Sequence, residues 1–96
     1  MITFDMLLAK RKEIIALAAR HKAGHVRVFG SVARGEASED RDVDLLVSFE
    51  PDASLFDLID LKEDAEQLLG TSVDVVSDGG ISPFLEQRIL SEAIDL

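Results

Sequence analysis

Apolar positions recur with two different periods along this chain, and the changes of period divide it into helices and strands. In the first twenty residues they recur every three or four positions, which predicts one amphipathic helix that ends between His21 and Gly24. The stripe of this helix that should face the core consists of Phe4, Leu7, Leu8, Ile14, Ile15 and Ala18.

Three short segments rich in β-branched residues predict strands near 25–29, 42–48 and 72–77. Between the last two, Ser54 and Asp57 can cap a helix that ends at Gly70, and Ser82-Pro83 can begin a final helix. The first of these helices should face inward with Leu55, Leu58, Ile59, Ala65, Leu68 and Leu69, and the final one carries Phe84, Leu85, Ile89 and Ala93. This order predicts an α+β fold, with a small mixed β-sheet flanked by helices.

Length and composition limit what such a chain can contain. Its 96 residues, 47% of them hydrophobic, predict a single domain over 1–96. It has no cysteine, which excludes a disulfide framework and a thiolate metal site and suits a cytoplasmic location. We expect no signal peptide and no membrane association, because charged residues interrupt the apolar stretches.

The net charge of −9 disfavours nucleic acid as a direct ligand. Residues 1–34 carry seven lysines and arginines against two acids, a net charge of +5, whereas residues 35–96 carry three against seventeen, a net charge of −14. The basic part could assist binding of a triphosphate. The acidic part could either dock on a positively charged protein or simply be a hydrated surface.

The most informative segment begins with Gly30 and Ser31, directly after the first predicted strand. A glycine has no Cβ to block an approaching phosphate, and a serine at a helix start offers a hydroxyl beside unpaired backbone N–H groups. This turn therefore predicts a phosphate site, with a short helical turn from Ser31 to Arg34 that Gly35 ends.

Aspartates follow the turn at a spacing that suits a metal site. Asp42 and Asp44 lie two residues apart in a predicted strand, so both carboxylates should point to one face and could bind Mg²⁺. Asp74, in the strand 72–77, could join them as a metal ligand or as a base for an acceptor hydroxyl. Such a site suits phosphoryl or nucleotidyl transfer.

The chain resembles the minimal nucleotidyltransferases (MNT) of the DNA polymerase β superfamily. Their pattern is Gly-Ser, ten residues, Asp-x-Asp and a later acidic residue, and here GSVARGEA and DVDLLV match it. The resemblance implies a polymerase β-like fold, nucleotide-binding residues Gly30 and Ser31, and Mg²⁺ held by Asp42, Asp44 and Asp74. Arg41 departs from the pattern, because members commonly have a serine before the first aspartate.

Small members of this family are often antitoxins of HEPN/MNT toxin–antitoxin systems. The resemblance therefore implies transfer of AMP from ATP to a hydroxyl, that of a tyrosine, on a HEPN-type ribonuclease toxin. Two alternatives stay open: a catalytically silent antitoxin that blocks the toxin by complex formation, which Arg41 slightly favours, or nucleotidyl transfer to a small molecule.

Overall fold

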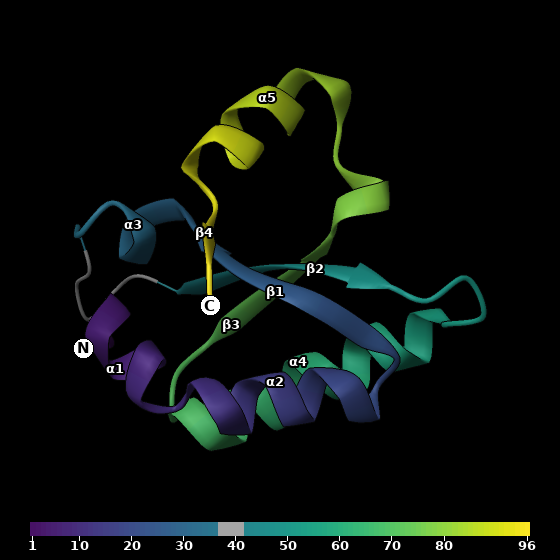
Figure 1. Ribbon diagram of the computed structural model, residues 1–96, viewed down its shortest axis with the longest axis horizontal. Coiled ribbons are helices and arrows are strands. Elements are labelled where there is room, and N and C mark those ends of the chain that lie inside the picture. Colours follow the sequence, from purple (N-terminus) through teal and green to yellow (C-terminus); the bar gives the residue numbers. More distant parts are fainter. Residues whose placement is uncertain (37–41) are drawn as a thin grey trace.

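Five helices and four strands make up the described part of the chain, residues 1–36 and 42–96 of this computed structural model (Figure 1). The helices are α1 (Phe4–Ala9), α2 (Arg11–Arg20), α3 (Gly30–Ala33), α4 (Leu55–Leu69) and α5 (Pro83–Glu92), and a short 3₁₀ turn, η1, spans Asp78–Gly80. The strands are β1 (Ala23–Phe29), β2 (Val43–Phe49), β3 (Val73–Ser77) and β4 (Ile94–Asp95).

The strands form one mixed sheet in the order β3-β2-β1-β4, which confirms the predicted architecture. β1 is antiparallel to both β2 and β4, whereas β2 and β3 are parallel and are connected through α4. The three expected strands are present with shifts of one or two residues. β4 was not predicted, because a two-residue strand has no periodicity and forms only where Val28 and Arg27 offer it an edge.

The two faces of the sheet are covered differently. α2 and α4 pack side by side against one face, while α5 lies over the other (Figure 1). The core occupies the first face, where alternate residues of β2 meet the helices. Its largest fully buried side chains include Leu7, Ile14, Val28, Val43, Leu45, Val47, Leu61 and Val73.

The amino-terminal helix differs from the expectation, because the chain forms two helices with a break at Lys10. The break changes which positions face the sheet. Leu7 and Ile14 are buried as expected, but Leu8 and Ile15 are exposed, and Leu17 takes the core position instead. The expected inward-facing stripe follows from an unbroken helix with 3.6 residues per turn. The break at Lys10 shifts this period, so the positions after it face in other directions.

The ends of α4 agree with the expectation more closely than its inward face does. The carboxylate of Asp57 accepts a hydrogen bond from the Ser54 N–H at 2.8 Å, and Gly70 ends the helix with φ +68°. The buried residues are Leu61, Ala65 and Leu69, a row spaced by four. Leu55 and Ile59 were expected to face inward but are exposed, because they lie off this row.

α5 begins at Pro83 as predicted but contributes no buried residue. Phe84 is 96% exposed, and Leu85 and Leu90 are also largely exposed. Among the apolar residues Ile89, Leu90, Ile94 and Leu96, Leu96 alone is buried and packs into the core.

A buried arginine fixes the start of the β3–α5 connection on the sheet. Arg27 of β1 is 8% exposed, and its Nη2 donates to Asp78 at 3.0 Å and to Ser48 of β2 at 3.2 Å. The Ser48 hydroxyl also donates to Asp78. The hydrogen bonds from Ser48 and Arg27 outweigh the effect of burial and lower the pKa of Asp78. This network joins β1, β2 and η1 beneath α5.

We expect Arg27→Gln to lower the free energy of unfolding by about 1–3 kcal/mol at neutral pH, because it leaves Asp78 without its cationic partner. Since the pKa of Asp78 is depressed in the folded state, this contribution is present above about pH 4 and is lost at lower pH. Urea unfolding at pH 7 and pH 3 measures both effects. Arg20→Gln, at an exposed position of α2, is the control, and equal midpoints for the two variants at pH 7 would contradict the role of the network.

Candidate functional site

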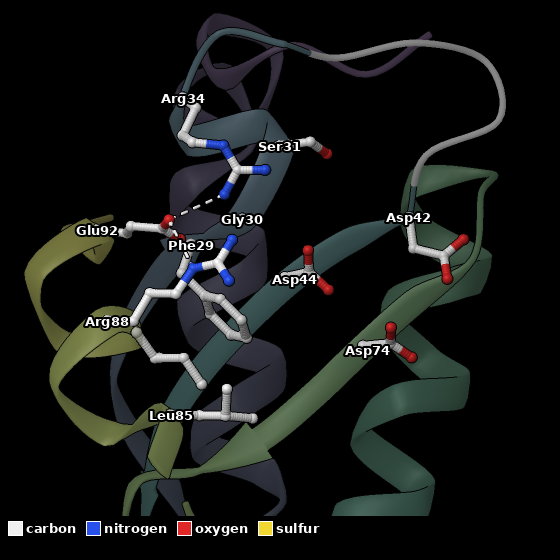
Figure 2. A pocket seen from close by; sticks show the side chains of 11 residues that line it. Phe29, Gly30, Ser31, Arg34, Asp42, Asp44, Asp74, Leu85, Arg88 and Glu92 are labelled. Atoms are coloured by element: carbon white, nitrogen blue, oxygen red, sulfur yellow. Dashed lines mark hydrogen bonds and ion pairs between the residues drawn. The ribbon is translucent and has the colours of Figure 1, made fainter.

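A cavity of about 430 Å³ lies where β1 ends and where β2 and β3 begin (Figure 2). Four segments of the chain form it: the β1–α3 turn, the start of β2 with the residue before it, the start of β3, and one side of α5. Its lining residues are Phe29, Gly30, Ser31, Arg34, Asp42, Asp44, Asp74, Leu85, Arg88, Ile89 and Glu92. All five residues predicted as site residues from the sequence are among them.

Gly30 directly follows β1 and has φ +72°, a conformation that side chains with a Cβ rarely adopt. A Cβ at this position would also overlap Oδ2 of Asp44. From the sequence, we expected the missing Cβ of Gly30 to leave room for a phosphate. In the structure, the carboxylate of Asp44 occupies that room. Glycine is therefore required for the backbone conformation and for the close approach of Asp44.

Ser31 lies within α3, which begins one residue earlier than expected. The residue is only 5% exposed but still contributes to the cavity wall. Figure 2 shows its hydroxyl directed away from Arg34, toward the open space in front of α3. Phe29 precedes the turn and is paired with Asp44 across β1 and β2, so the register of the sheet places the turn beside the carboxylates.

The pairing of β2 with β3 brings two of the aspartates together. Asp44 and Asp74 are direct partners in the parallel register, and neighbouring strands lie about 4.8 Å apart. Both side chains project from the face opposite the core (Figure 2). Asp42 lies just before β2, which begins at Val43, and not within the strand as predicted. Asp42 and Asp74 are exposed, whereas Asp44 is partly buried.

The electrostatics of this cluster favour a bound cation. Burial raises the pKa of Asp44 to about 6, and the charges of Asp74 and Asp42 add to the shift, while the charge of Arg34 opposes it. A divalent ion near these carboxylates would offset their repulsion, and carboxylate oxygens are suitable ligands for Mg²⁺. The residues present therefore fit the ion that the family implies.

The carboxylates do not by themselves form a complete metal site. Within residues 1–36 and 42–96, no three His, Cys, Asp or Glu side chains are grouped so as to hold one ion. This agrees with the usual mode of Mg²⁺ binding, in which one or two carboxylates combine with water and substrate phosphates. Asp74 has a cation nearby, since its Oδ1 lies 4.0 Å from Nζ of Lys62.

The opposite side of the cavity carries Arg34, Arg88 and Glu92, which were not among the predicted site residues. Arg34 Nε lies 2.9 Å from Glu36, and Arg34 Nη1 lies 3.0 Å from Glu92 of α5. Burial acts to raise the pKa of Glu92, but its hydrogen bonds with Arg34 and with the backbone N–H of Gly30 outweigh this effect and lower the pKa. Glu92 thus joins α5 to the Gly-Ser turn.

Arg88 and Glu92 could not be found from the motif, because they lie more than forty residues beyond Asp44 and no local spacing connects them. Arg41, which the sequence analysis identified as a departure from the family pattern, lies outside the described residues.

None of the helices in the described ranges is long and apolar enough to span a membrane.

Comparisons with known proteins agree with this geometry. Protein adenylyltransferase MntA of Thermococcus cleftensis is 42% identical over 90 residues, which cover 94% of this chain and 88% of that protein. MJ0435 of Methanocaldococcus jannaschii, named as a candidate protein adenylyltransferase, is 42% identical over 86 residues, which cover 90% of this chain and 92% of that protein.

Solved structures show the same fold. One described as a minimal nucleotidyltransferase is 52% identical, with a TM-score of 0.88 over 99% of this chain and 97% of that chain. A chain from the complex of tri-AMPylated Shewanella oneidensis HEPN toxin with MNT antitoxin is 21% identical, with a TM-score of 0.72 over 94% of this chain and 71% of that chain. This last similarity concerns the fold alone.

The family is defined by sequence as well as by fold. Residues 11–96 match the Nucleotidyltransferase domain family. Since the relatives at 42% identity are also spanned almost completely, the resemblance inferred from the Gly-Ser and Asp-x-Asp pattern is confirmed, and the chain belongs to the nucleotidyltransferase domain family, in its minimal form.

Proposed function

We propose that residues 1–96 act as one Mg²⁺-dependent nucleotidyltransferase domain that transfers AMP from ATP to a hydroxyl of a partner protein, a tyrosine of a HEPN-type toxin, and thereby acts as its antitoxin. The observation that carries this proposal is the convergence of the Gly-Ser turn and three aspartates on one cavity. Carboxylates that face a glycine-serine turn across one cavity suit nucleotidyl transfer better than they suit binding of a hydrophobic ligand.

Each motif residue has a role that follows from its position. Gly30 and Ser31 line the side of the cavity where the nucleotide phosphates would bind. Asp42 and Asp44 would hold Mg²⁺, with Asp74 beside them as a third ligand or as the acceptor of the hydroxyl proton. When bound, the ion would neutralise phosphate charge and orient the triphosphate. Because Asp74 is exposed, an incoming hydroxyl can reach its carboxylate.

The relatives and the charge distribution support a protein acceptor. MntA of Thermococcus cleftensis is named a protein adenylyltransferase, and a structural relative is described in complex with an AMPylated HEPN toxin. The net charge of −14 over residues 35–96 disfavours nucleic acid and complements a basic protein, such as one that binds RNA.

A catalytically silent antitoxin is the alternative that an experiment should separate from this proposal. Such a protein would bind its toxin through the same surface without using ATP. Transfer to a small molecule is a further alternative, and it predicts consumption of ATP without modification of the partner.

The central test is incubation of the purified chain with a HEPN-type protein, ATP and Mg²⁺. Intact-mass measurement should show one or more added AMP masses on the partner, and replacing its acceptor tyrosine with phenylalanine should remove them. Asp44→Asn should abolish the addition while preserving complex formation. A partner that is inhibited but unmodified would support the silent antitoxin instead.

Asp44→Asn should also stabilise the metal-free protein at neutral pH. The folded pKa of about 6 lies above the unfolded value of about 3.9, so ionisation of Asp44 destabilises the fold as pH rises through this interval. After allowance for partial solvent exposure, we expect a gain of about 1–2 kcal/mol at pH 7.5 that vanishes near pH 4. Urea unfolding with a chelator measures it. Asp60→Asn, exposed on α4, is the control for removal of a carboxylate, and a less stable Asp44→Asn protein at pH 7.5 would refute the destabilising effect of the Asp44 charge.

Gly30→Ala should nearly abolish AMP transfer, because the new methyl group displaces the Asp44 carboxylate. Gly35→Ala is a matched control, since Gly35 has a similar φ of +75° but no atom of residues 1–36 and 42–96 within 4 Å of its Cβ position. Both variants should lose about 1 kcal/mol of stability, while only Gly30→Ala should lose activity. Ser31→Ala should weaken nucleotide use only moderately. Steady-state rates and urea midpoints distinguish these effects, and equal activities for the two glycine variants would contradict the displacement.

A further inference from the structure

The described part of the cavity wall carries two cationic side chains, and their environments differ. Arg34 has two carboxylate partners within hydrogen-bond distance, Glu36 at 2.9 Å and Glu92 at 3.0 Å. These two anions offset its charge. Arg34 is therefore held by the protein itself.

Arg88 lies on α5 and has weaker contacts with carboxylates than Arg34 has. Its one ion-pair contact within residues 1–36 and 42–96 joins Nε to Glu92 at 3.6 Å, beyond hydrogen-bond distance. Its side chain is 70% exposed, and within the same residues its Nη groups form no hydrogen bond. Figure 2 shows the guanidinium directed from α5 into the cavity, toward the space beside Gly30 and Asp44.

This position faces the three aspartates across the cavity. A nucleoside triphosphate carries about four negative charges, and the carboxylates on its other side would repel it unless cations intervene. Metal ions would lie on the aspartate side, so phosphate oxygens that point toward α5 need a different partner. A guanidinium offers two parallel N–H donors that match the geometry of a phosphate.

We propose that Arg88 is a further substrate-binding residue, which binds the β- and γ-phosphates of the nucleotide from the α5 side of the cavity. The inference rests on the proposed function and adds to it a residue outside the Gly-Ser and aspartate motifs. Because Arg88 and Gly30 line the same cavity, the two could contact the same phosphates, and AMP, which lacks these phosphates, would not reach Arg88.

Calorimetric titration of the purified chain tests this directly. The probes are an ATP analogue with a nitrogen bridge between its β- and γ-phosphates, and AMP, both in the presence of Mg²⁺. Arg88→Gln should weaken binding of the analogue about ten- to a hundredfold and leave AMP affinity within about twofold of the wild-type value. Arg88→Lys should retain part of the affinity, because lysine keeps the positive charge but lacks the paired N–H donors of the guanidinium.

Arg20→Gln, at an exposed position of α2 away from the cavity, is the matched control and should bind both probes as the wild type does. Urea midpoints should be unchanged in all variants, because α5 has no buried residue. Unchanged affinity of Arg88→Gln for the analogue, or an equal loss of AMP affinity, would overturn the role of Arg88 while leaving nucleotidyl transfer intact. Failure of the wild-type protein to bind either probe would overturn the proposed function and this inference together.

Discussion

The close packing of Gly30 against the carboxylate of Asp44 is the constraint on which the site depends. β1 and β2 are antiparallel, so the end of β1 meets the start of β2, and Phe29 pairs with Asp44. The next residue must then turn with a positive φ and leave room for a carboxylate, and glycine satisfies both conditions. This one contact brings the Gly-Ser turn and the first carboxylates to the same place.

The two faces of the sheet separate stability from chemistry. Alternate residues of β2 point to opposite faces, so Val43, Leu45 and Val47 build the core while Asp44 lies on the other side. Burial and neighbouring charges destabilise the ionised form of Asp44 in the absence of a cation. The apolar core on the other face of the sheet offsets the cost of these repelling carboxylates, as is common for functional sites.

α5 completes the cavity although it contributes little to the core. Ion pairs flank it on both sides: Arg27 pairs with Asp78 of η1, ahead of the helix, and Arg34 pairs with Glu92, its last residue. Because α5 itself has no buried residue, these polar contacts and the pairing of β4 with β1 set where it lies over the sheet. The helix can therefore present Arg88 and Leu85 to the cavity without packing as a core element.

The sequence by itself determined the main strands, the caps of α4 at Ser54 and Gly70, the mixed sheet and the five motif residues, because each depends on local periodicity, local backbone preference or a fixed spacing. Only the tertiary structure decided the break at Lys10, the exposure of Leu8 and Ile59, the added strand β4, and the approach of Arg88 and Glu92 to the Gly-Ser turn. The added strand and the approach of Arg88 and Glu92 arise from contacts between segments far apart in the chain, and the pattern within any one segment carries no information about them.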